Sequence, residues 1–242
     1  MPFYAYDLHI HSCLSPCGDA LMTPPNIVNM AYIKGIDIIA ITDHNSARNV
    51  RAVMRAAEDL PLTVVPGIEV TTAEEIHVVC LFPDADSAEK AGKELEKHLP
   101  PIRNRPEYFG EQVLMDENEE ITGYFPLLLP NALDISIDVL PYLVERFDGF
   151  CYPAHIDRAS NSVIAVFGEV PPEPVFASLE VYDSKRFFGD AQNLHYRESF
   201  NIVNSSDAHR LQDISERERF IELDEPSFSC LRKVPGTAKT IK

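Results

Sequence analysis

Histidine and carboxylate side chains follow short apolar runs at five places in the chain. These are the residue types that bind divalent transition-metal ions. His9 and His11 end the first of these runs, and Asp207 and His209 follow the last. Because residues two apart on a strand point to the same face, each pair can hold one ion. The spacing therefore predicts a metal centre assembled from several strands.

The elements that must position these residues alternate between strand and helix. Short β-branched runs predict strands, and apolar residues at helical spacing predict the helices between them. The predicted strands are 6–11, 36–42, 62–70, 76–82, 149–154, 179–182 and 202–205. The predicted helices are 24–35, 47–59, 86–98 and 136–147, with Thr23, Ser46 and Asp86 as the N-caps of the first three. This order predicts an α/β fold of β/α-barrel type, in which active sites lie at the carboxyl ends of the strands.

The stretch from residue 99 to residue 133 interrupts the alternation. Three prolines open it, and two strand-like runs follow on either side of an acidic turn at 116–120. We expect an inserted hairpin that serves as a flap or packing element within a single domain spanning 1–242. The final residues, 237–242, are expected to dock loosely.

Composition excludes several classes of protein. With 21 Lys and Arg against 38 Asp and Glu, the formal charge of −17 disfavours binding of long nucleic acids through a basic patch. No apolar run approaches the ~18 to 20 residues that span a bilayer, and the first residues do not resemble a signal peptide. The five cysteines are odd in number and show no CxxC pairing, which predicts free thiols. We therefore expect a cytoplasmic protein without a membrane partner; its oligomeric state is left open.

Five motifs occur in order over roughly residues 5–215. They are Asp7-Leu8-His9-Ile10-His11-Ser12, Ile41-Thr42-Asp43-His44, Gly67-Ile68-Glu69, Pro153-Ala154-His155 and Ser206-Asp207-Ala208-His209. Together they resemble the PHP (polymerase and histidinol phosphatase) superfamily. The resemblance implies a distorted seven-stranded β/α barrel, a trinuclear metal centre and phosphoesterase activity. The interval from Glu69 to His77 is most similar to that of members acting on nucleotides or short oligonucleotides, which ranks a histidinol-phosphate phosphatase lower.

The resemblance also implies how two or three metals, of Zn, Mn or Fe type, would be held. The implied ligands are His9, His11 and Asp207 for one metal, Glu69, His77 and His155 for a second, with Glu69 bridging the two, and His44 with His209 for a third. The third needs one more ligand from the loop after the first strand. Alignment with the family pattern favours Asp19 there, and Cys17 is the alternative because a thiolate favours zinc.

Such a centre would hydrolyse a phosphomonoester or phosphodiester of a small metabolite, a nucleotide or a short oligonucleotide. The nucleophile would be a metal-bridging hydroxide, supported by Asp207 and His209, because bound metals lower the pKa of water towards ~7. Arg158, Arg210 and Lys185 are the candidates for binding the substrate phosphate.

Two carboxylates and two competing functions complete the interpretation. Asp43 and Asp7 are expected to orient ligand histidines.

One competing function is an amidohydrolase-type hydrolase, although no Lys ends a core strand to bridge its metals. The other is a catalytically inactive, metal-binding regulatory module.

Overall fold

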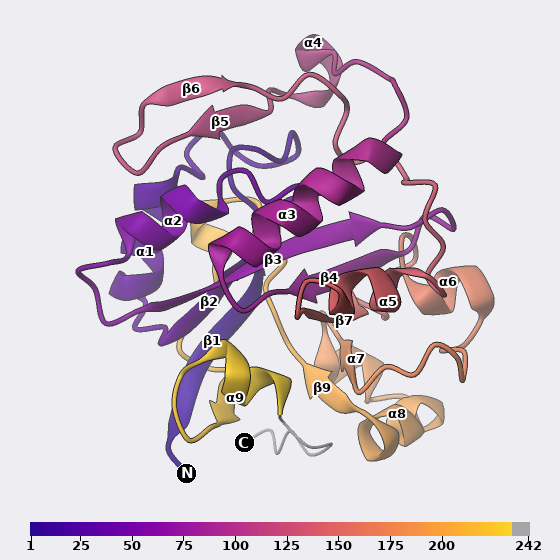
Figure 1. Cartoon of the computed structure of the whole chain (residues 1–242). Coiled ribbons are helices and arrows are strands. Elements are labelled where there is room, and N and C mark those ends of the chain that lie inside the picture. The colour runs from indigo at the N-terminus through magenta and orange to yellow at the C-terminus, as the bar shows by residue number, and fades with distance from the viewer. Residues whose placement is uncertain (234–242) are drawn as a thin grey trace.

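A six-stranded mixed sheet forms the centre of the molecule in the computed structural model, which describes residues 1–233 (Figure 1). The predicted loosely docked segment 237–242 lies outside the described residues. The strand order is β10-β1-β2-β3-β4-β7. The strands are β1 (Phe3–Ile10), β2 (Ile38–Ile41), β3 (Thr63–Thr71), β4 (His77–Leu81), β7 (Phe150–Pro153) and β10 (Phe220–Glu222). Strands β1, β2 and β3 are parallel, whereas β4 is antiparallel to both β3 and β7, and β10 is antiparallel to β1.

Two short strand pairs lie outside this sheet. The first is the antiparallel hairpin of β5 (Val113–Met115) and β6 (Ile121–Tyr124), and the second is the parallel pair of β8 (Ser178–Glu180) and β9 (Asn201–Val203). Each of the seven predicted runs overlaps a strand, but hydrogen bonding does not join these strands into one seven-stranded ring. Single contacts join the β8–β9 pair to the two sides of the main sheet. The Ile156 amide, after β7, donates to the Glu180 carbonyl of β8, and an isolated bridge joins Ile10 of β1 to Ala208, after β9. The result is an α/β half-barrel.

Four helices correspond to those predicted, and all four are shorter than the sequence pattern. They are α1 (Pro24–Ile33), α2 (Val50–Ala56), α3 (Ala85–Leu95) and α5 (Leu140–Glu145). The remaining short helices are α4 (Pro106–Phe109), α6 (Val163–Phe167), α7 (Ser184–Phe187), α8 (Leu194–Ser199) and α9 (Phe228–Arg232), with 3₁₀ turns η1 (Glu96–His98), η2 (Ala191–Asn193) and η3 (Leu211–Asp213). Among the residues described, no helix is both long and apolar enough to span a membrane.

The helix starts follow capping chemistry, with two corrections to the sequence prediction. Thr23 caps α1 as predicted, because its side chain accepts from the Asn26 amide. Ser46 does not cap α2, since its hydroxyl donates to Glu96 instead and the helix begins at Val50. The cap of α3 is Asp84 rather than Asp86.

Two apolar clusters lie on the two faces of the sheet. Ile39 and Ile41 belong to the larger one, together with residues of α1, α2 and α3, which run along the same side of the sheet (Figure 1). Ile38 and Ala40 alternate with them and belong to the smaller cluster inside the half-barrel. Leu231 of α9 packs into this inner cluster. The polar residues of the predicted centre lie at the other end of the sheet, around the carboxyl ends of β1, β2 and β3.

The hairpin packs against the loop that follows β1. The Val113 amide donates to the Cys13 carbonyl at 2.9 Å. Gly110, which has φ +97°, lies so close to this loop that an added Cβ would be 2.1 Å from the Pro16 carbonyl oxygen. Only glycine fits this contact, which joins the predicted flap segment to the loop containing Cys17.

Candidate metal centre

Strand direction explains why ligands far apart in sequence meet at one end of the sheet. Because β1, β2 and β3 are parallel, their carboxyl ends lie side by side, and β7 points the same way after two antiparallel steps. Strand β4 runs the other way, so its first residue, His77, pairs with Thr71 at the end of β3. His77 therefore reaches the same edge from the start of a strand.

Glu69 lies at the centre of the cluster. Its side chain is only 1% exposed and its carboxylate meets the rings of five histidines. The distances from its oxygens are 2.8 Å to Nδ1 of His77, 3.0 Å to Nδ1 of His44, 3.2 Å to Nε2 of His9 and of His155, and 3.3 Å to Nε2 of His11. One carboxylate cannot form an ordinary salt bridge with five imidazole rings at once. A carboxylate that binds two metal ions is expected to be surrounded by several imidazoles in this way.

The ligand atoms fall into three overlapping groups, each within 4.8 Å. The groups are His9, His11, Glu69 and Asp207; His44, Glu69 and His77; and His11, Cys17, His44 and His209. The first group contains the predicted ligands of one metal and the predicted bridging residue. The second and third share His44, and His155 joins the second through its contact with Glu69.

Four buried atoms of the cluster test whether it suits metal ions. Nε2 of His9, Nδ1 of His44 and Oε2 of Glu69 have no hydrogen-bond partner although charged atoms lie within 3.3 Å, and Nδ1 of His155 also has none. Buried polar atoms are normally hydrogen-bonded. These nitrogen and oxygen atoms lie close together without being aligned for hydrogen bonds to one another. The ligand atoms around a metal ion are arranged in the same way. Imidazoles and carboxylates are the donors that Zn, Mn and Fe accept, so the residues fit divalent metals.

The pKa values show how strongly these charges interact. Burial opposes protonation of His11, but its hydrogen bond to Asp207 and the nearby carboxylate of Glu69 raise its pKa to about 9. Burial also opposes charge on His44, whose pKa is raised to about 9 by Glu69 and Cys17. Although burial raises the pKa of Glu69, the charges on its histidine neighbours hold that pKa well below the usual value. Protons and metal ions therefore compete for the same ring nitrogens.

His209 has the opposite shift and a defined tautomer. Burial, together with the charge on His11, lowers its pKa to about 4, so the ring is neutral at pH 7. Its Nδ1 lies 2.8 Å from the Asp207 carbonyl oxygen. Because a carbonyl only accepts, Nδ1 carries the proton and Nε2 keeps a free lone pair for a metal.

Glu180 supports the centre and was not predicted as a site residue. Its oxygens lie 3.0 and 3.1 Å from Nδ1 of His9, and one of them accepts from the His155 amide. This fixes the ring of His9 with Nε2 towards Glu69. In the sequence Glu180 lies inside the predicted strand 179–182, whereas in the structure it is the last residue of β8.

Asp43 and Asp7 hold the loops around the ligands. Asp43 accepts from the hydroxyl of Ser15 at 2.7 Å, and that hydroxyl lies 3.0 Å from Nδ1 of His11. Asp7 accepts from the Ser206 amide, next to Asp207. Asp207 itself has φ +51°, a conformation that non-glycine residues adopt mainly where the surroundings enforce it.

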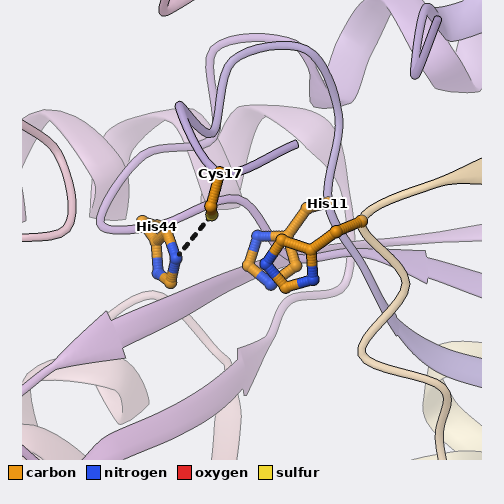
Figure 2. A group of neighbouring side chains, drawn as sticks. His11, Cys17 and His44 are labelled. Carbon is orange, nitrogen blue, oxygen red and sulfur yellow. Dashed lines mark hydrogen bonds between the residues drawn. The ribbon is translucent and has the colours of Figure 1, made fainter. Parts of the chain in front are cut away.

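The structure brings Cys17, and not Asp19, to the third group. The Cys17 sulfur lies 3.3 Å from Nε2 of His44, with His11 close by (Figure 2). Asp19 is exposed, and its carboxylate accepts from the Leu21 amide within its own turn. The preference for Asp19 over Cys17 therefore disagrees with this geometry.

A cleft of about 190 Å³ opens over the cluster and includes only one of the three proposed phosphate-binding residues. Arg158 lines it, and its Nη1 lies 2.8 Å from Oδ2 of Asp207. Arg210 and Lys185 are exposed and are not among the residues that line this cleft.

The half-barrel carries a buried cluster of histidines and carboxylates of the kind that holds divalent metal ions. The PHP domain family model matches residues 7–159. The chain belongs to the PHP domain family, as the motifs indicated.

Individual proteins match smaller parts of the chain or share only its fold. A 5′-3′ exoribonuclease of Haemophilus influenzae is 33% identical over 79 residues, which is 31% of this chain and 28% of that protein. The lesion-specific endonuclease Q of Pyrococcus furiosus is 18% identical, with a TM-score of 0.68 over 97% of this chain and 56% of that one. Endonuclease Q in complex with a 27-mer duplex matches with a TM-score of 0.62 and 18% identity, over 96% and 56% of the two chains. The present chain thus spans about half of endonuclease Q, and its match to the exoribonuclease is shorter still.

Proposed function

We propose that this chain is a metal-dependent phosphoesterase that hydrolyses a phosphomonoester or phosphodiester of a nucleotide, a short oligonucleotide or a small metabolite. The observation that carries the proposal is Glu69, a buried carboxylate in contact with five imidazoles. We assign the three ligand groups to as many as three metals, with Cys17 as the loop ligand of the third. The whole chain is one barrel domain, with residues 99–133 as a flap.

The residues of the chain have distinct roles in this proposal. Bound divalent metals supply hydroxide at neutral pH and neutralise charge on the phosphoryl group. Asp207 turns Oδ1 towards His9 and His11 and Oδ2 towards Arg158. This contact holds the guanidinium at the mouth of the cleft, where its other N–H groups can bind a phosphate oxygen. Glu180 fixes His9, so the ligand nitrogen needs no reorientation on binding.

The relatives support a nucleotide-type substrate. The exoribonuclease and endonuclease Q both act on nucleic acids by name, and endonuclease Q also binds a 27-mer duplex. This chain carries a formal charge of −17, which favours short substrates drawn to a local metal cluster over long ones held by a basic surface. The exclusion of long nucleic acids stays a prediction.

A substrate panel tests the proposal. The protein would be loaded with Mn²⁺ or Zn²⁺ and assayed on phosphomonoesters, phosphodiesters, short oligonucleotides and amides. We expect turnover of at least one phosphoester, loss of turnover on chelation and recovery when metal is restored. Turnover of amides alone would favour the amidohydrolase alternative, and a fully loaded protein inactive on every substrate would favour the regulatory module.

A further inference from the structure

A second, larger cleft adjoins the one above the metal cluster. It has a volume of about 450 Å³ and shares Arg158, Asp207 and His209 with the first. This volume is within the range of about 300 to 1,000 Å³ typical of small-molecule sites. A substrate with its phosphate at the cluster would therefore extend its remaining part into this cleft.

The aromatic side chain in this second cleft is Tyr182, and its backbone is held rigidly. The side chain of Asp157 is 1% exposed, and its two oxygens accept from the amides of Tyr182 and Asp183, each at 2.8 Å. Tyr182 itself remains 44% exposed. The ring is thus presented to solvent from a fixed backbone, which reduces the entropy lost when a ligand stacks on it.

Arg158 connects this ring to the metal centre. Its guanidinium carbon lies 4.5 Å from the centroid of the Tyr182 ring, while its Nη1 contacts Asp207. Tyrosine rings and arginine guanidinium planes are the surfaces on which unpaired nucleobases stack. Gln212 and Asp213 line the same cleft and offer hydrogen bonds to sugar hydroxyls or base edges.

We infer that Tyr182, supported by Arg158, is the stacking platform for the nucleoside attached to the scissile phosphate. The inference rests on the proposed phosphoesterase function and narrows its substrate to a nucleotide or a strand with an unpaired base at the reactive phosphate. A paired base is not available to Tyr182, because its faces are covered by its neighbours in the duplex. Asp157 is a positioning residue, since it acts through the backbone of Tyr182.

Binding measurements test this without relying on turnover. The probes are the phosphonate analogue of adenosine 5′-monophosphate, which has no P–O–C bond to the sugar to hydrolyse, and methylphosphonate, which has no base. Each would be titrated calorimetrically into the metal-loaded protein. We expect Tyr182→Leu to reduce the preference for the nucleoside probe over methylphosphonate by roughly 5- to 100-fold, and Tyr182→Phe to retain most of it.

The controls separate a stacking role from other effects. Tyr142, which is 68% exposed on α5, provides the matched variant Tyr142→Leu, for which we expect the wild-type preference. An unchanged preference in Tyr182→Leu would overturn the inference, and so would a loss in Tyr182→Phe as large as that in Tyr182→Leu. Failure to hydrolyse any phosphoester while the preference behaves as expected would contradict the proposed function and leave the platform intact.

Discussion

The sulfur of Cys17 lies 3.3 Å from Nε2 of His44, at the edge of the cluster where a carboxylate was expected. Gly18 and Asp19 continue the same turn, and the Asp19 amide donates to the His209 carbonyl while its side chain stays outside. Placing a thiol beside three imidazoles makes this the softest of the three groups, which favours zinc over manganese there.

The first prediction concerns the third metal. Replacement Cys17→Ser removes the sulfur ligand, so we expect the zinc content of the purified protein to fall by up to one ion per chain. Asp19→Asn is the matched control from the same loop and should leave the content unchanged. Metal analysis by mass spectrometry checks both variants, and equal zinc loss in the two would contradict the assignment of Cys17.

A second prediction concerns the support of His9 by Glu180. Glu180→Gln keeps the size of the side chain but removes the charge that fixes the His9 ring, so metal affinity should fall about 10- to 100-fold. A chelator competition titration measures this change. Glu107→Gln, on the exposed helix α4, is the control and should bind metal as the wild type does. Unchanged affinity in Glu180→Gln would show that His9 needs no such partner.

The third prediction is the pH dependence of the metal-free protein. The pKa values of His11 and His44 are raised to about 9 in the folded state, against about 6.5 in the unfolded chain. Their protonation therefore stabilises the fold fully below pH ~6.5, and this contribution is lost as the pH rises through 9. We expect the free energy of unfolding to fall over this interval, by on the order of 3 kcal/mol per histidine at most.

Urea unfolding in the presence of chelator, from pH 6 to pH 9.5, measures this slope. The zinc-loaded protein should show the opposite trend at the lower end of the range, because protons displace metal from the same nitrogens. A metal-free protein that becomes more stable between pH 6.5 and pH 9 would contradict the charge arrangement around Glu69.

A fourth prediction tests the contact between the hairpin segment and the Cys17 loop. Gly110→Ala would place a Cβ against the Pro16 carbonyl at φ +97°, so we expect destabilisation of about 1 to 3 kcal/mol. Gly123→Ala in β6 is the matched control, because its Cβ would meet only Leu114 at 3.6 Å. Thermal unfolding compares the two, and equal stability of both variants would show that the contact is not needed.

Much of the fold was predictable because strand ends and the predicted metal ligands coincide in this sequence. The apolar run in each motif predicted a strand, and the position of the His or Glu within the motif predicted the end of the strand at which that side chain lies. His9 and Glu69 are examples. Strand β10 was not predicted because Phe220 and Ile221 stand among charged residues without a longer apolar run, and the strand depends on pairing with β1. The start of α2 was misplaced because Ser46 has a tertiary partner, Glu96, that local sequence does not reveal.

Within the candidate site, the sequence predicted the residues that lie on strands more accurately than those that lie on loops. The loop after β1 contains two possible ligands, Cys17 and Asp19, and only the path of its turns decides which one lies next to His44. Glu180 was missed because a single carboxylate has no spacing signal of its own. Arg158 and Arg210 both follow ligand histidines closely, yet only Arg158 turns towards Asp207.

The central claim is that the cluster around Glu69 hydrolyses a phosphoester. The most direct measurement is the rate of phosphoester hydrolysis by the metal-loaded wild type and by Glu69→Gln, with bound metal quantified in each. We predict measurable hydrolysis by the wild type that chelation abolishes, and a rate at least about 100-fold lower in Glu69→Gln. Wild-type rates in Glu69→Gln, or a fully loaded wild type that cleaves no phosphoester, would contradict the account.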